Sequence, residues 1–211
     1  MILRPDVYVA RVGDDVVLLD TGVGEYLCLV DAASAFELQP AGAIRVLDAE
    51  LAAEVEAAGL CGNGRALRTR TVKPAALDIA DDHSARAPAE GLANGVASFV
   101  ELLRAYYGRP FARLIRYADK RRRSDAPALT AALANQVQAF RKILPWSPFQ
   151  GVCFYRSFFL LAFLRRRGFD AAWVFGVRTW PFEAHCWLQV DDVVLDDRLD
   201  HVRTFTPILA V

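Results

Sequence analysis

The sequence has few of the features that would place the chain in a membrane or in an oxidising compartment. Its four cysteines, Cys28, Cys61, Cys153 and Cys186, form no CxxC pair, so neither a zinc ribbon nor a disulfide framework is indicated. No basic and apolar signal segment opens the chain. Its longest apolar stretch is interrupted by Arg156 and is shorter than the roughly 20 residues that span a bilayer. We therefore expect a cytoplasmic protein with no membrane partner.

The chain also lacks net charge, but its charges are unevenly distributed. Residues 1–60 contain three basic and eleven acidic residues, and the rest of the chain has the compensating positive excess. This asymmetry favours two modules and argues against nucleic acid as a partner of the acidic one. With 54% hydrophobic and 24% charged residues, a chain of this length can bury a substantial core.

The first 60 residues predict a small sheet followed by helices. Three apolar runs, VYVARV, VVLLD and EYLCLV, are separated by Gly- and Asp-rich turns, which is typical of an antiparallel meander. The stretch Asp31–Gly59 is predicted to be helical, with a break at Pro40 and a second helix in DAELAAEVEAAGL. The overall fold class is therefore α+β. We assign residues 1–80 to a winged-helix-like recognition domain.

Such a module has two interpretations. An exposed strand edge can accept an extended peptide as an additional strand, and Tyr26, Leu27 and Leu29 are then candidate contacts. Alternatively, the module is a docking domain for the rest of the chain. The sequence does not separate a groove from a core at these three positions.

Between the two modules we expect a linker at residues 81–90, where His83 is interpreted as solvated. The C-terminal domain spans residues 91–211 and opens with two predicted helices, one after Gly91 and one ending near Leu144. The basic segment between them is either a solvated face or a contact for an acidic partner or a nucleotide phosphate.

Two later runs suggest nucleophilic chemistry. The run GVCFYRSFFLLAFLRRRG predicts a helix that begins at Cys153, where the helix N-terminus favours the thiolate. The run AHCWLQVDDVVLDD predicts a hairpin, with His185 on one strand and Asp197 at the end of the next. A thiol, an imidazole and a carboxylate in this order fit a transglutaminase- or papain-like triad on a helix followed by an antiparallel sheet.

Other residues compete for these roles. Asp196 and Asp200 are alternatives to Asp197 as the orienting carboxylate, since alternation alone does not choose among them. Gln150 is a candidate oxyanion donor beside the Cys153 backbone N–H. His201 is interpreted as structural or solvated.

Two further residues are assigned structural roles. We expect Cys186 in the core, on the opposite face of its strand from His185. A zinc site built from Cys153, His185 and Cys186 is therefore disfavoured, and no metal is assigned. Arg156 is interpreted as one half of a structural ion pair.

The sequence resembles the B proteins of lasso-peptide biosynthesis in their fused form, a leader-recognition domain followed by a transglutaminase-like cysteine peptidase. The resemblance rests on CFYRSFFLLAFLRRRGFDAAWVFGV, similar to the family's C-x-x-R-S helix, and on PFEAHCWLQVDDVVLDD, similar to its A-H-x-W hairpin. It implies Cys153 as the nucleophile, His185 as the general base and Asp197 as the orienting acid. It also implies that the precursor's leader is added beside the third strand.

The resemblance further implies partners: the leader of a lasso precursor peptide and an ATP-dependent cyclase resembling asparagine synthetase. Any ATP dependence would then belong to the cyclase, because this chain has no P-loop and no cofactor site is identified in it. Two alternatives to a leader peptidase stay open. One is a cysteine acyltransferase that uses an amine in place of water, and the other is a non-catalytic adaptor that presents the leader.

Overall fold

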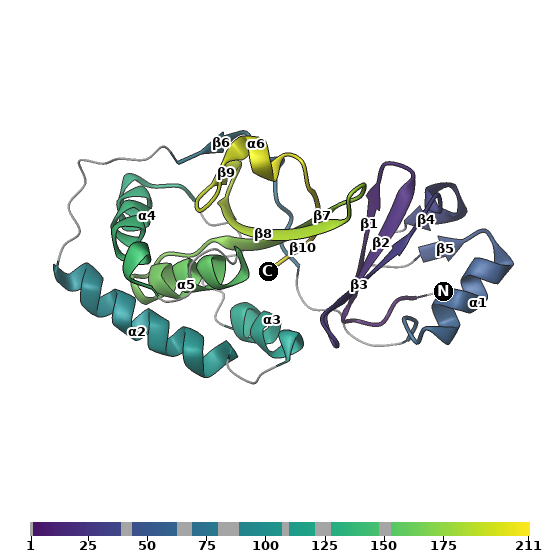
Figure 1. Cartoon of the computed structure of the whole chain (residues 1–211), viewed down its shortest axis with the longest axis horizontal. Coiled ribbons are helices and arrows are strands. Elements are labelled where there is room, and N and C mark those ends of the chain that lie inside the picture. Colours follow the sequence, from purple (N-terminus) through teal and green to yellow (C-terminus); the bar gives the residue numbers. More distant parts are fainter. Residues whose placement is uncertain are drawn as a thin grey trace.

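The computed structural model describes residues 2–38, 44–62, 69–79, 89–106, 110–120, 128–147 and 153–211. It is an α+β fold in which a small N-terminal sheet lies beside a larger helix-and-sheet unit (Figure 1). The N-terminal elements are β1 (Val7–Val12), β2 (Asp15–Asp20), β3 (Glu25–Leu29), β4 (Phe36–Leu38), β5 (Ile44–Val46) and α1 (Ala49–Ala57). The later elements are β6 (Leu77–Asp78), α2 (Ala89–Tyr106), α3 (Phe111–Lys120), α4 (Ala131–Ile143), α5 (Cys153–Arg166), β7 (Ala172–Arg178), β8 (Glu183–Val190), β9 (Val193–Val194), α6 (Leu199–Val202) and β10 (Thr206–Ala210).

The predicted three-stranded N-terminal sheet is present, in the antiparallel order β1-β2-β3. Its central strand β2 is buried on both faces, because successive side chains point to opposite sides. Val17 and Leu19 pack into the large C-terminal core, whereas Val16 and Leu18 pack against β4, β5 and α1. Strand β2 thus contributes to two cores, which explains why its four central residues are all apolar instead of alternating with polar ones.

The predicted helix over residues 31–38 is wrong. Ala33–Ala35 form a single 3-10 turn, and Phe36–Leu38 form a strand that pairs with Ile44–Val46. Phe36 and Ile44 are buried in the small N-terminal core, so tertiary packing overrides the helix propensity of the alanines. The later helix is confirmed as α1, whose N-cap Asp48 accepts a hydrogen bond from the backbone N–H of Leu51.

The C-terminal unit is a five-stranded sheet in the order β10-β7-β8-β9-β6, packed against helices that include α5. Its core is rich in aromatic side chains. The ring of Phe159 lies 4.8 Å from that of Phe140, and the ring of Phe158 lies 5.4 Å from that of Trp173. The predicted helix at Cys153, the strands around it and the C-terminal strand are confirmed. Helix α3 was not predicted, although it buries Leu114 and Ile115 completely.

Residues 69–79 lie against the C-terminal sheet, although the sequence placed them within the first module. The backbone N–H of Arg70 bonds to the carbonyl of Ala210, and Leu77–Asp78 pair in parallel with Val193–Val194. Arg70 also forms a buried ion pair with Asp170, at 2.6 Å. The predicted linker lies outside the described residues except for its last two positions, which begin α2. The boundary at residue 80 stays a prediction.

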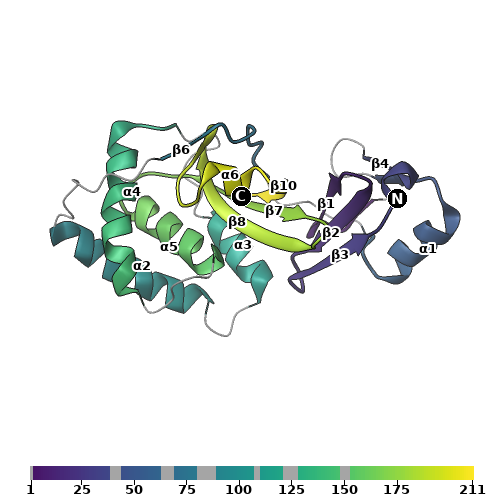
Figure 2. The same cartoon turned by 45° about the horizontal axis from the view of Figure 1, so that its top comes forward.

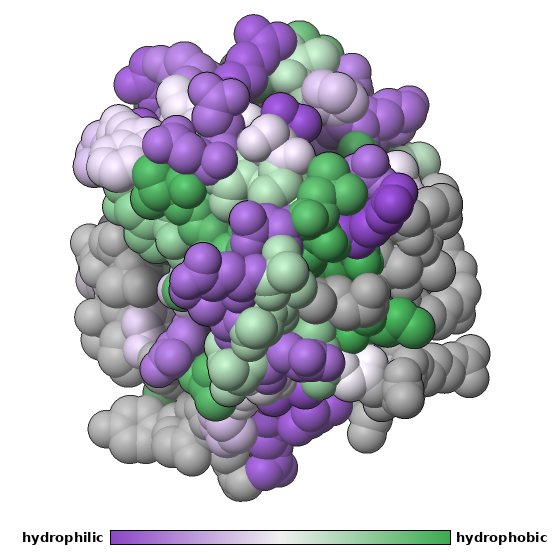
Figure 3. All heavy atoms as spheres, turned by 90° about the vertical axis from the view of Figure 1, so that its right-hand side faces the viewer, coloured by the Kyte–Doolittle hydropathy of each residue, from purple (hydrophilic) through white to green (hydrophobic). Residues whose placement is uncertain are grey.

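The two sheets meet at the tip of the β7–β8 hairpin, which extends toward β1–β3 (Figure 2). Trp180 donates its indole N–H to Asp15 at 2.8 Å, and the ring of Tyr26 lies 5.9 Å from that of Phe182. The outer end of the N-terminal unit has green apolar patches interspersed with purple polar side chains (Figure 3). Within the described residues, no helix combines the length and the apolar character needed to cross a bilayer.

Candidate active site

Cys153 is the first residue of α5 and is half-buried where this helix meets β8. Nine residues of α5 are buried, which fixes the helix against the sheet. Ser157 adds a polar tie, since its Oγ lies 2.8 Å from the Cys153 carbonyl oxygen and 3.2 Å from that of Cys186. The first turn of α5 is therefore held in register with the strand that contains His185.

His185 is 8% exposed, and its Nε2 lies 2.5 Å from Oδ2 of Asp197. The short loop after β9 positions Asp197, whose Oδ1 accepts the backbone N–H of Arg198 at 2.7 Å. His185 also forms a hydrogen bond with the thiol of Cys153. The structure thus brings the three predicted residues together: Cys153 contacts His185, and His185 contacts Asp197.

The surroundings of Cys153 favour its thiolate form. A hydrogen bond from the Cys186 thiol is the largest effect on the pKa of Cys153. Burial opposes it, and the contact with His185 reinforces it. Together these effects lower the pKa of Cys153 to about 4. Cys153 is therefore deprotonated at neutral pH, and the thiolate is the nucleophilic form.

His185 is held in the complementary charge state. Burial works to lower its pKa, but the hydrogen bonds with Asp197 and Cys153 outweigh burial and raise the pKa to about 9. For Asp197, burial works to raise the pKa, and the hydrogen bonds from His185, Arg198 and His201 hold it well below the usual range. At neutral pH the three groups form a thiolate–imidazolium pair backed by a carboxylate.

The contacts of Asp196, Asp197 and Asp200 show which of these three carboxylates lies against His185. Asp196 accepts hydrogen bonds from Ser157 Oγ and from the backbone N–H of Leu188, both at 2.7 Å, and burial raises its pKa. Asp200 instead pairs with Arg198 at the surface. Asp197 is the aspartate that contacts His185. Its catalytic role remains a proposal.

His201 lies in this cluster, although the sequence suggested a structural or solvated residue. Its Nδ1 is 3.1 Å from Asp197 Oδ2, and its ring centroid is 4.6 Å from that of His185. The signal that could have found it is the four-residue spacing between Asp197 and His201, although Asp197 lies two residues before the helix that carries His201. The helix concerned, α6, has only four residues and leaves little periodicity to detect.

Arg156 forms the expected ion pair, and its partner is a member of the site. One guanidinium nitrogen lies 3.6 Å from Asp197 Oδ2. Cys186 is buried as expected, and its thiol contacts Cys153. The candidate oxyanion donor Gln150 lies outside the described residues, as does His83.

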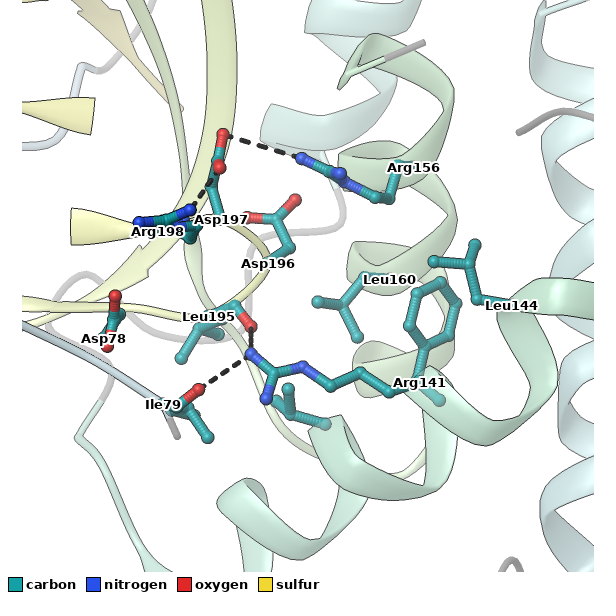
Figure 4. A pocket seen from close by; sticks show the side chains of 12 residues that line it. Asp78, Ile79, Arg141, Leu144, Arg156, Leu160, Leu195, Asp196, Asp197 and Arg198 are labelled. Carbon is teal, nitrogen blue, oxygen red and sulfur yellow. Dashed lines mark hydrogen bonds and ion pairs between the residues drawn. The ribbon is translucent and has the colours of Figure 1, made fainter. Parts of the chain in front are cut away.

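A cavity of about 600 Å³ adjoins Asp197 on the side toward α4 (Figure 4). Arg141 closes one wall by donating to the carbonyl oxygens of Ile79 and Leu195, at 2.9 and 3.2 Å. The described residues that line it are Asp78, Ile79, Val137, Phe140, Arg141, Leu144, Arg156, Leu160, Leu195, Asp196, Asp197 and Arg198. Cys153 and His185 are not part of it, so this cavity lies behind the carboxylate and not over the thiolate.

Within the described part of the chain, one group of residues has donor atoms that could converge on a metal ion. The donor atoms of His185, Asp197 and His201 lie within 4.8 Å of one another. Two ligands of a tetrahedral zinc ion are ~3.3 Å apart, given metal–ligand bonds of about 2.0–2.1 Å. The separation of 2.5 Å between His185 Nε2 and Asp197 Oδ2 is shorter than that. The observed arrangement therefore favours a direct hydrogen bond between these two groups over a metal ion between them.

The three candidate peptide contacts occupy different environments on β3. Tyr26 faces the C-terminal core, and burial is the main cause that raises its pKa, with Cys186 and Cys153 adding to it. Leu27 is 41% exposed, and Leu29 packs partly into the N-terminal core. Of the three, Leu27 is the side chain most accessible to a peptide at the edge.

Comparison with known proteins agrees with this geometry. No curated protein and no solved structure matched the chain. The model of the transglutaminase-like superfamily matches residues 96–210, more than half of the chain. The matched region spans from α2 to β10 and includes Cys153, His185 and Asp197. The C-terminal part of the predicted resemblance is thereby confirmed, and the chain belongs to the transglutaminase-like superfamily.

Proposed function

We propose that the chain is a cysteine peptidase that removes the leader from a lasso precursor peptide. The observation on which this depends is the contact of the Cys153 thiolate with His185, whose imidazolium is in turn held by Asp197. Superfamily membership supports cysteine chemistry on acyl groups. The sequence resemblance described above supports the narrower choice of substrate.

The proposed reaction begins from the ion pair. The Cys153 thiolate attacks the scissile carbonyl, and the carbon–nitrogen bond breaks as His185 donates its proton to the leaving amine. The core peptide departs with a free amine, and the leader stays on Cys153 as a thioester. His185, now neutral, removes a proton from water as its oxygen attacks the thioester. The carbon–sulfur bond then breaks, which releases the leader as its carboxylic acid and restores the Cys153 thiolate. Asp197 stabilises the imidazolium at each stage.

The edge of β3 supports a route for the substrate. This strand pairs with β2 on one side, and no described strand pairs with its other side. A peptide added antiparallel to β3 would run from Leu29 toward Glu25. The Glu25 end lies nearer the thiol, because Gly24 abuts Phe111 and the ring of Phe111 lies 5.7 Å from that of Phe154, the residue after Cys153. The peptide's C-terminal end would thus reach the nucleophile.

The proposal includes a partner. Removal of the leader creates the free amine that a ring-closing enzyme needs, so we propose an ATP-dependent cyclase resembling asparagine synthetase as the next enzyme. No nucleotide or metal is assigned to this chain.

Replacement of the nucleophile tests the proposal. Cys153→Ala should abolish cleavage of the precursor, followed by mass spectrometry, while affinity for the leader is unchanged. Cys61→Ala is the matched control, since Cys61 packs beside the N-terminal core. Cleavage by Cys153→Ala at the rate of the control would refute the assignment. An unreactive Cys153 in an otherwise folded protein would instead favour the adaptor alternative.

Acyl transfer is a second candidate, because superfamily membership covers acyltransferases as well as peptidases. Both reactions pass through the same thioester. Adding a primary amine during precursor cleavage separates them. A peptidase should release mainly the free leader acid, whereas a transferase should release mainly the leader amide.

A further inference from the structure

The carboxylate of Asp197 is contacted by more groups than a Cys-His-Asp site requires. Its Oδ2 lies 2.5 Å from His185 Nε2, 3.1 Å from His201 Nδ1 and 3.6 Å from a guanidinium nitrogen of Arg156. Its Oδ1 accepts the backbone N–H of Arg198. Two imidazoles therefore share one oxygen, and the second of them has no part in the chemistry described so far.

The fold fixes this second imidazole. Helix α6 begins two residues after Asp197 and brings His201 back over the carboxylate. The His201 ring lies edge-on to Phe205, with centroids 5.3 Å apart, and Phe205 also lies 5.1 Å from His185. One aromatic side chain thus backs both histidines, so their separation is set by packing as well as by the shared oxygen.

We propose that His201 is a positioning residue that holds the Asp197 carboxylate toward His185. The proposal rests on the proposed role of Cys153, His185 and Asp197, and it deepens the account of that site. Donation from His201 Nδ1 to Oδ2 satisfies a second lone pair on the oxygen that faces His185. Asp197 then remains where it stabilises the imidazolium.

The Asp197 carboxylate needs the restraint from His201 because Arg156 also lies within ion-pairing distance of that carboxylate. It competes for the same oxygen, and its Nε, buried at the edge of the cavity behind Asp197, has no hydrogen-bond partner among the described residues. Figure 4 shows the Arg156 side chain reaching toward Asp197 from α5. Without His201, the carboxylate can turn toward this guanidinium and lengthen its hydrogen bond to His185. The imidazolium would then lose stabilisation, and so would the thiolate beside it.

Two substitutions at residue 201 separate positioning from packing. Leu fills much of the volume of His201 but cannot donate a hydrogen bond. Asn is smaller, yet its side-chain amide nitrogen can take the place of Nδ1 and donate to Asp197. A positioning role therefore predicts a large effect for His201→Leu and a small one for His201→Asn.

The readout is the pH dependence of Cys153 alkylation by iodoacetamide, which needs no peptide substrate. Among the described residues, the charged or titratable groups near Asp197 and His201 are Cys153, Arg156, His185, Asp196, Arg198 and Asp200. We expect His201→Leu to move the acid midpoint of alkylation upward by about half to one pH unit, and His201→Asn to restore most of the shift. In an Asp197→Asn background, His201→Leu should add no further shift, since its effect acts through Asp197.

Cleavage of the precursor provides the second measurement. With thermal unfolding unchanged, His201→Leu should lower kcat about tenfold and leave KM unaltered, because it removes one hydrogen bond to a charged group. Equal alkylation midpoints in the wild-type protein and His201→Leu, or equal shifts in Leu and Asn, would overturn the proposal. Because alkylation is independent of the peptide, failure of the wild-type protein to cleave would count against the proposed function alone.

Discussion

Replacing Asp197 by Asn tests how much of the site depends on this carboxylate. The pKa of His185 lies at about 9, against a usual value of 6.5, and Asp197 and Cys153 are the two partners that raise it. If they contribute comparably, Asp197→Asn lowers the pKa of His185 by roughly 1 to 1.5 units, or about 1.4 to 2 kcal/mol. The imidazolium would then be lost closer to neutral pH.

The sign of the pH effect follows from this shift. His185 donates a proton to the leaving amine, so cleavage falls as pH rises through the pKa of His185. Asp197→Asn should therefore move the alkaline limb of kcat downward by about 1 to 1.5 pH units. At the optimum, kcat should fall by about 10- to 30-fold, because about 1.4 to 2 kcal/mol of imidazolium stabilisation is lost and each 1.4 kcal/mol is a factor of ten.

The assay measures precursor cleavage from about pH 5 to 10. Asp200→Asn is the matched control, because Asp200 is an exposed aspartate three residues further along the chain that pairs with Arg198. The Asp200→Asn control should show the alkaline limb of kcat at the wild-type pH and should cleave the precursor at the wild-type rate. An alkaline limb at the same pH in Asp197→Asn and in the control would refute the assigned role of Asp197.

Three further predictions concern other parts of the molecule. Asp170→Asn should lower the free energy of unfolding by about 3–5 kcal/mol in urea titrations, since it breaks the buried ion pairs of Asp170 with Arg70 and Arg165, at 2.6 and 2.8 Å. Asp200→Asn, at an exposed position, should change the free energy of unfolding little, and equal unfolding midpoints of the two variants would contradict the prediction. Ser157→Ala leaves buried Asp196 without its hydroxyl donor and should cost about 1–3 kcal/mol, against almost nothing for exposed Ser34→Ala. Leu27→Asp at the β3 edge should weaken binding of the leader peptide at least about tenfold in calorimetry, with unchanged Cys153 alkylation. Leu47→Asp, which changes another exposed leucine away from that edge, should not weaken it; equal affinities of the two variants would count against strand addition at β3.

Much of the fold could be predicted because the local patterns agree with the tertiary packing. The apolar run of α5, the alternation in β8 and the turn before Val193 each predict the element that the structure contains. The position of Cys153 at a helix start and of His185 on a strand could be predicted for the same reason, whereas Asp197, predicted at the end of a strand, lies in the loop after β9. In each case the residues that define the element also form its buried face.

The elements that the sequence does not predict are those whose local pattern conflicts with tertiary packing or is too short to recognise. The Ala-rich stretch 31–38 has helix propensity, but burial of Phe36 against β5 makes its last part a strand. The apolar positions of α3 were obscured by its arginines. The association of residues 69–79 with the C-terminal sheet depends on long-range pairing that has no local pattern.

The active-site residues also divide into those that local sequence patterns predict and those that only the packed structure reveals. The sequence could not choose among Asp196, Asp197 and Asp200, because the choice depends on how the chain turns after β9. The sequence does not place His201 in the site, because a four-residue helix carries almost no periodic signal. The thiol contact between Cys186 and Cys153 joins two elements that are distant in the sequence, so only the packed structure reveals it.

The proposed reaction requires Cys153 to form a covalent intermediate with the leader. Rapid acid quenching of the protein with a precursor peptide, followed by intact-mass and peptide-level mass spectrometry, tests it most directly. We expect a mass gain equal to the leader on the Cys153 peptide, with the core released as a free amine, and no adduct in Cys153→Ala. Release of the core with no leader attached to Cys153 at any quench time, or an adduct on another residue, would contradict it.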